Sequence, residues 1–179
     1  MAPPREKIHI DRATANDAAE ISALIQRTIR ASNADDYDAK VIDALCTAFS
    51  PDEVTNQTDH DFVLICMLDS QLAGTAGSTI KETEASGITH HINSLFVDLK
   101  YQGQGLGRVL IAEIEKHARA EGAASLTANA ALTAEAFYRA LGFTAEGHRS
   151  EGLGDTIFMR KGLGDKSYSD NSRADCYSV

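Results

Sequence analysis

The 179 residues carry a formal net charge of −9 and three cysteines, with 43% apolar and 24% charged residues. This length and mixture are typical of one globular domain and differ from disordered, collagen-like or membrane compositions. A net negative chain lacks the clustered Lys and Arg that neutralise phosphates, so we expect no nucleic-acid partner. The negative charge would suit a cationic substrate, although it is also typical of a soluble surface.

No apolar run approaches the length of a membrane span, and charges occupy residues 1–11, where a signal peptide has its apolar segment. We therefore expect a cytoplasmic protein with no membrane partner. Cys46, Cys66 and Cys176 are too widely spaced for a zinc pattern or a disulfide framework. Cys46 and Cys66 fall within apolar patterns, which favours burial over a nucleophilic role.

Two helices are predicted early in the chain. Apolar residues recur at helical spacing over 14–32 and over 38–49. Pro51 lies just past the second segment, as is typical after a helix end, and Asp36 or Asp38 is placed to cap its start. These acids, together with Asp35, would alternatively attract a cationic amine.

The other predicted elements are strands and two further helices. Strand patterns occur at residues 8–10, 62–68, 72–80, 88–99, 125–130, 144–149 and 156–161. Helical patterns cover 105–121 and 133–141, with Thr133 as the expected N-cap of the second. Gly122 is placed to end the first in the left-handed conformation, and Gly142 closes the second. We expect one domain over residues 1–163 and a polar, mobile tail over 164–179.

The most informative segment joins a strong predicted strand to a strong predicted helix, over residues 101–108 (Tyr-Gln-Gly-Gln-Gly-Leu-Gly-Arg). A helix N-terminus has unpaired N–H groups and a partial positive charge, and glycine lets a phosphate approach the backbone closely. Arg108 and Val109 follow Gly107 where a Walker loop needs Lys and then Ser or Thr. The glycine spacing also differs from a dinucleotide fingerprint, which leaves another type of phosphate loop or a simple tight turn.

The residues Gln102-Gly103-Gln104-Gly105-Leu106-Gly107 resemble the Gln/Arg-x-x-Gly-x-Gly/Ala pyrophosphate loop of the GNAT superfamily of N-acetyltransferases. Residues 92–97 resemble the family's central strand, and Asn129 followed by residues 137–143 resembles its second signature. The resemblance extends over about residues 7–163. It implies a mixed, mostly antiparallel sheet of about six or seven strands flanked by about four helices, and splayed where the pantetheine arm of CoA enters.

The resemblance also implies a ligand and its contacts: acetyl-CoA as co-substrate, with no metal. Phe96 and Val97 would bond the pantetheine arm through their main chains, and Asn129 would meet the same arm from the neighbouring strand. The residues that would hold the pyrophosphate are Gln102, Gly103, Gln104, Gly105, Leu106, Gly107 and Arg108.

Three catalytic roles have candidates. By resemblance, Tyr138 would protonate the leaving sulfur, or else only pack its ring and bond CoA, and the Val97 N–H would polarise the thioester carbonyl. Many relatives carry Glu where this chain has Asn93, which cannot accept a proton. His91 lies on the same strand face and is the candidate base, while His90 points the other way. Deprotonation through ordered water would need no dedicated base.

The expected function is acetyl transfer to a primary amine of a small molecule or peptide, by direct attack on the thioester. One alternative is an acetyl-CoA sensor without turnover, and another is a structural adaptor, since a fold does not fix a function. The sequence leaves the amine unidentified and a homodimer open.

Overall fold

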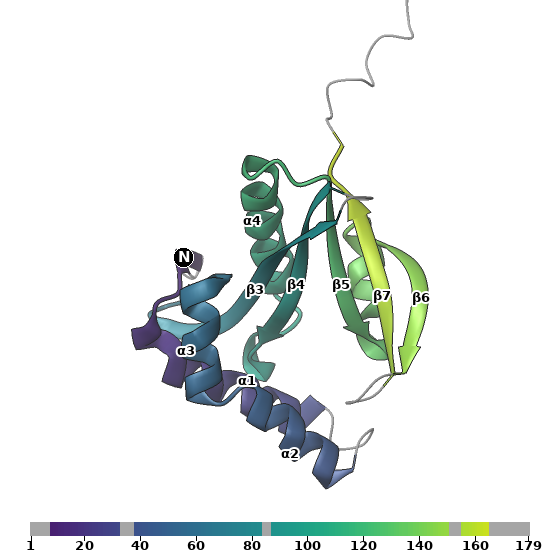
Figure 1. Ribbon diagram of the computed structural model, residues 1–179. Helices are drawn as coiled ribbons and strands as arrows, with labels where there is room; N and C mark the ends of the chain where they lie inside the picture. The colour runs from purple at the N-terminus through teal and green to yellow at the C-terminus, as the bar shows by residue number, and fades with distance from the viewer. Residues whose placement is uncertain (1–7, 33–37, 84–86, 151–154, 165–179) are drawn as a thin grey trace, which may run out of the picture.

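A computed structural model describes residues 8–32, 38–83, 87–150 and 155–164. Seven strands form one mixed sheet in the order β1-β2-β3-β4-β5-β7-β6 (Figure 1). Only β4 and β5 run parallel to each other, and the other neighbours are antiparallel. The strands are β1 (Ile8–Arg12), β2 (Phe62–Leu68), β3 (Gln71–Thr83), β4 (Gly87–Val97), β5 (Ser125–Ala131), β6 (Thr144–Ser150) and β7 (Asp155–Gly162).

Helices cover the two faces of this sheet in separate groups. They are α1 (Ala18–Ser32), α2 (Ala39–Ala48), α3 (Pro51–His60), α4 (Leu106–Ala120) and α5 (Glu135–Ala140). Strand β2 shows how the faces are divided, because Leu64 and Cys66 pack toward α4 whereas Val63 and Ile65 pack toward α1. Each fully buried aliphatic side chain of these two clusters contributes about 1.5–3 kcal/mol. The described residues contain no helix long and apolar enough to span a membrane.

The predicted mixed sheet is confirmed, but one helix was missed and one cap was misplaced. Pro51 follows the end of α2, as predicted, yet it is also the first residue of α3, where Ser50 accepts the cap hydrogen bond from Glu53 N. Proline is well tolerated at a first helical position, because its missing N–H would have no helical partner there. Thr133 lies inside a short 3-10 turn, and Ala134 is the N-cap of α5.

Several local predictions agree with the structure. Asp38 caps α2 by accepting from Val41 N at 3.0 Å, and Gly122 ends α4 with φ 75°. Cys46 and Cys66 are buried. Asp35, Asp36, Cys176 and the tail from residue 165 lie outside the described residues.

The sheet opens between β4 and β5. These two strands pair only where Thr89–Ile92 meet Ser125–Ala128, and beyond that they diverge (Figure 1). Asn93 is the first β4 residue past the paired stretch and forms a bulge, because Ile92 and Ser94 pair with the adjacent β3 residues Ser78 and Gly77. The divergence leaves one side of β4 without a neighbouring strand from Asn93 to Val97.

Candidate active site

A hollow of about 510 Å³ lies between the end of β4, the start of α4 and α5. Most of its described lining is glycine and apolar residues, and Arg108 is the single charged residue among them. Its described lining is Leu95, Val97, Tyr101, Gln102, Gly103, Gly105, Leu106, Gly107, Arg108, Thr133, Ala134 and Phe137. Every predicted loop residue from 102 to 108 therefore lines the hollow except Gln104.

The glycines of this loop create an uncovered helix N-terminus. Gly105 is the N-cap of α4 with φ 85°, and no side chain caps the helix there. Gly103 is also left-handed, and a Cβ at either glycine would meet no atom within 4 Å. Because no side chain takes up the first helical N–H groups, they remain open to an anion in the hollow.

Gly107 serves a different purpose in the same loop. A Cβ on Gly107 would lie 3.2 Å from Cζ and 3.4 Å from Cε2 of Phe137 on α5. Contacts this short are tighter than ordinary packing, so a side chain at this position would displace the Phe137 ring. Gly107 therefore lets the Phe137 ring pack directly against the first turn of α4.

Main-chain groups of β4 also face the hollow. Asp98 N donates to Ala73 O of β3 at 2.9 Å. Since successive strand residues direct their N–H and C=O groups to opposite sides, Leu95 and Val97 point theirs away from β3 and into the divergence. Phe96 points its main chain toward β3, and its ring packs edge-on against Phe49 at 5.3 Å. The structure thus brings Val97 to the hollow by its main chain, but not Phe96.

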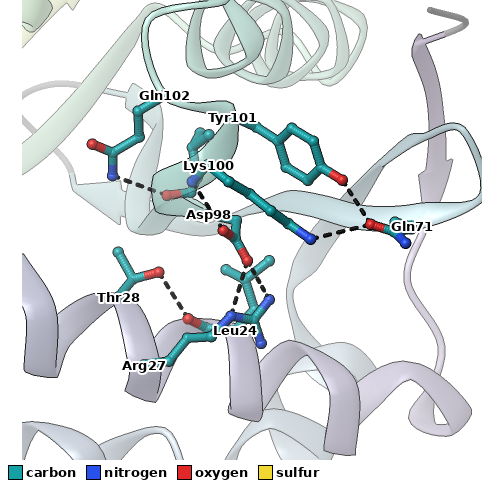
Figure 2. A network of polar contacts seen from close by, with 9 residues as sticks. Leu24, Arg27, Thr28, Gln71, Asp98, Lys100, Tyr101 and Gln102 are labelled. Carbon is teal, nitrogen blue, oxygen red and sulfur yellow. Dashed lines mark hydrogen bonds and ion pairs between the residues drawn. The ribbon is translucent and has the colours of Figure 1, made fainter.

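A polar network holds the loop against β3 and α1 (Figure 2). Asp98 accepts from Arg27 Nε at 2.9 Å and Nη2 at 2.6 Å, and from Lys100 N at 3.1 Å. Burial alone would raise the pKa of Asp98, but the hydrogen bonds and charge of Arg27 and the Lys100 N–H bond hold it below its usual value. Gln102 Nε2 donates to Val97 O at 3.0 Å, so its side chain braces the loop.

The same network reaches β3 through one further side chain. Gln71 Oε1 accepts from the Tyr101 hydroxyl at 2.8 Å and from Lys100 Nζ at 3.1 Å (Figure 2). The loop is thereby tied to two elements far from it in sequence, which orders its backbone before any ligand binds.

Tyr138 lies beside the hollow in the core between α5 and the sheet. It is 6% exposed, and its ring packs edge-on against Phe137 at 5.3 Å and Phe143 at 5.2 Å. Burial raises the pKa of Tyr138. The phenol therefore keeps its proton at neutral pH, and Phe137 rather than Tyr138 forms the described wall of the hollow.

A second hollow, of about 380 Å³, lies on the sheet face opposite α4 and α5. Its described lining comes from β3 to β7: Lys81, Thr89, His91, Thr127, Asn129, Arg149, Phe158 and Arg160. Asn129 is exposed here and is the first β5 residue beyond the β4 pairing. It thus stands where the sheet opens, and it lines the second hollow rather than the first.

His91 faces this second hollow, as its strand position predicted. Its Nδ1 lies 3.0 Å from the Thr127 hydroxyl, which fixes the ring and leaves Nε2 for other contacts. Burial lowers the pKa of His91, and the charges of Lys81 and Arg149 lower it further. His90 points to the other face, where its ring meets His117 of α4 at 5.5 Å.

Asn93 forms a hydrogen bond with the Asp61 carboxylate at the bulge. Its Nδ2 donates to Asp61 Oδ2 at 2.7 Å, while its Oδ1 is buried without a partner among the described residues. Asp61 lies at the junction of α3 and β2, and α3 was not predicted. The sequence contained no signal that could have joined residues 61 and 93.

Sequence reasoning also missed the cations of the second hollow. Lys81, Arg149 and Arg160 come from three different strands, so their meeting depends on sheet order. The alternation of each strand was the only available signal. It predicts which face of the sheet a side chain occupies, but not which side chains of other strands lie beside it. The described residues contain no cluster of three or more His, Cys, Asp or Glu suited to a metal ion.

The fold and these two hollows define a class of protein. A splayed sheet with an uncovered, glycine-rich helix N-terminus beside the splay is the arrangement that the resemblance to the GNAT superfamily implied. The family comparison agrees, because the acetyltransferase (GNAT) domain model matches residues 33–160. The chain belongs to the GNAT family of acetyl-CoA-dependent N-acetyltransferases.

Solved structures show the same fold. The chain is 26% identical to the GCN5-related N-acetyltransferase from Rhodopseudomonas palustris, with a TM-score of 0.75, over 86% of this chain and 94% of that one. It is 17% identical to the paia N-acetyltransferase from Thermoplasma acidophilum, solved in complex with coenzyme A, with a TM-score of 0.75 and coverage of 87% and 99%. The yncA structure from Salmonella typhimurium, solved with acetyl-CoA, is 21% identical, with a TM-score of 0.62 and coverage of 93% and 99%. No curated protein sequence gives a significant match.

Proposed function

We propose that this chain transfers the acetyl group of acetyl-CoA to a primary amine by direct attack of the amine on the thioester, within one domain over residues 1–163. One observation carries this proposal: the uncovered N-terminus of α4 faces the hollow at the point where β4 and β5 diverge. The second hollow lies on the opposite face of the sheet, over the paired stretch of β4 and β5, and reaches the divergence at Asn129, so the amine would approach the thioester from the face opposite α4.

The residues present fit a CoA pyrophosphate. The first N–H groups of α4 would bind its oxygens, while Gly103 and Gly105 leave the approach clear and Arg108 adds a positive charge. The N–H groups of Leu95 and Val97 would pair with the pantetheine arm and the thioester carbonyl, in place of the Phe96 main chain. Asn129 would bond the arm from β5, at the edge of the second hollow.

The transfer step requires stabilisation of an oxyanion, protonation of the departing sulfur and removal of a proton from the amine. The amine lone pair attacks the carbonyl carbon, the new C–N bond forms, and the C–S bond breaks. The Val97 N–H would stabilise the oxyanion, and Tyr138 would give its proton to the departing sulfur and recover one from solvent. The proton lost by the amine would pass to His91 Nε2, directly or through water. The products are the N-acetylated amine and CoA with a free thiol.

Tyr138 and His91 differ in how well their surroundings suit these roles. The raised pKa of Tyr138 keeps the phenol protonated at neutral pH but also makes it a weaker acid toward the departing sulfur. The lowered pKa of His91 keeps its ring neutral at pH 7, ready to accept a proton although as a weaker base. Asp61 accepts a hydrogen bond from Asn93 at the bulge, and it lies outside the described lining of both hollows.

The test combines a calorimetric titration of CoA with an assay of thiol release from acetyl-CoA in the presence of single amines. We expect CoA to bind and thiol release to depend on the amine, with an equal amount of N-acetylated product. Binding without amine-dependent release would instead favour a sensor. No binding of CoA would remove the basis of the proposal.

A further inference from the structure

The second hollow has a charge opposite to that of the whole chain. The chain carries −9, yet the described lining of this hollow holds Lys81, Arg149 and Arg160 and no acid. Arg160 donates to Glu146 at 2.9 Å, whereas Lys81 and Arg149 form no ion pair within the described part of the chain. An amine with only positive charge would be repelled from this surface.

The Phe158 ring lies beside Arg149 and Arg160. The guanidinium carbon of Arg149 lies 4.4 Å from the centroid of the Phe158 ring, and that of Arg160 lies 5.6 Å from it. The N–H groups of Arg160 already bond Glu146 and Ser125, whereas Arg149 keeps its N–H edge free of ion pairs with described residues, and that edge matches the two oxygens of a carboxylate or phosphate. Phe158 also supplies an apolar surface for the rest of a small ligand.

The position of the hollow connects it to the transfer step. His91 lines it, and the positive charges of Lys81 and Arg149 are close enough to act on the imidazole. From these contacts we infer that the acceptor is a small amine that also carries an anionic group, a carboxylate or a phosphate, held by Arg149 and Lys81 over Phe158. This inference rests on the proposed function, because it identifies the substrate class of the same site.

Binding of such a substrate would also make His91 a stronger base. An anion between Lys81 and Arg149 offsets their charge, so His91 accepts a proton more readily when the acceptor is bound than when it is absent. Among the described residues, the charged groups that line the hollow with His91 are Lys81 from β3, Arg149 from β6 and Arg160 from β7. Amines without an anionic group would lack this effect and would react more slowly at equal concentration.

The activity test uses matched amines. L-leucine is compared with L-leucinamide, and glucosamine 6-phosphate with glucosamine, so that each pair differs in one anionic group. We expect kcat/KM to be at least about tenfold higher for the anionic member of one pair, which also separates carboxylate from phosphate recognition. Arg149→Gln should abolish most of that preference while CoA affinity stays unchanged. Arg30→Gln is the control, because Arg30 is an exposed arginine of α1 that pairs with Asp43 at 3.2 Å.

A binding test gives a result that is independent of turnover. The His91 ring is followed by NMR in the CoA complex while inorganic phosphate or acetate replaces chloride at constant ionic strength. We expect the titration midpoint of His91 to move to higher pH, and Arg149→Gln to prevent the move. An unmoved midpoint, or equal or higher kcat/KM for the amines that lack the anionic group, overturns the inference. A moved midpoint without acetylation of any amine would support the anion site and refute the proposed function.

Discussion

Replacement of Gly105 tests whether the α4 N-terminus binds the pyrophosphate. Gly105 has φ 85° and open space around its Cβ position. A side chain in the left-handed region costs about 1–2 kcal/mol. That cost lowers Tm by roughly 2–8 °C in a domain of this size. A glutamate there would also place a negative charge at the mouth of the hollow.

The charge effect can be separated from the strain. A pair of like charges 4 Å apart repels by about 1 kcal/mol in water and about 4 kcal/mol at an effective dielectric of 20. A pyrophosphate with two charges therefore binds at least about tenfold more weakly to Gly105→Glu than to Gly105→Gln. The difference should shrink at high salt, because screening weakens exposed charges.

Gly122 provides a matched control at the opposite end of α4. It has φ 75°, and a Cβ there would also meet no atom within 4 Å. Gly122→Glu should lose similar thermal stability and keep its CoA affinity in calorimetric titration. Equal CoA affinities of Gly105→Glu and Gly105→Gln, or an equal loss in Gly122→Glu, would refute the assigned role of the loop.

Three further predictions concern catalysis and loop positioning. Tyr138→Phe should slow single-turnover acetyl transfer by roughly tenfold to a thousandfold, because the ring still packs but the proton donor is lost. A large rise in the CoA Kd would instead mean that the hydroxyl binds CoA. For the parent, kcat/KM should rise with pH through the pKa of His91, below its ordinary value near 6.5. His91→Ala should flatten that limb more than His90→Ala, and an unchanged profile would exclude His91 as base. Asp98→Ala should lower the free energy of unfolding by about 1.5 kcal/mol at pH 7, measured by denaturant unfolding. This value is at the low end for hydrogen bonds to charged groups, because the Arg27 side chain is half-exposed. It should also weaken CoA binding, whereas Asp43→Ala should cost less than about 1 kcal/mol. The Asp98 contribution should disappear as the pH falls through its lowered pKa, and equal losses for both variants would refute the positioning role.

Local signals were enough to predict most elements of this fold. Alternation, the compact apolar run over residues 62–68 and helical spacing located all seven strands and four of the five α-helices of the described residues, because these patterns report which parts of a segment are buried. Helix α3 was missed because its sequence is mostly polar, with Val54 and Thr58 its only buried residues, and because Pro51 fits both a helix end and a helix start. The loop over residues 102–107 was also readable, since its glycines act through their own backbone.

Only the tertiary structure decided which side chains meet at the site. Alternation placed His91 on one face of β4, but sheet order determined that Lys81, Arg149 and Arg160 surround it. The contact between Asn93 and Asp61 depends on where α3 ends. The net charge of −9 suggested a cationic substrate, whereas the charges beside His91 are positive, because composition sums over the whole surface and recognition depends on the few groups within a Debye length of the bound ligand.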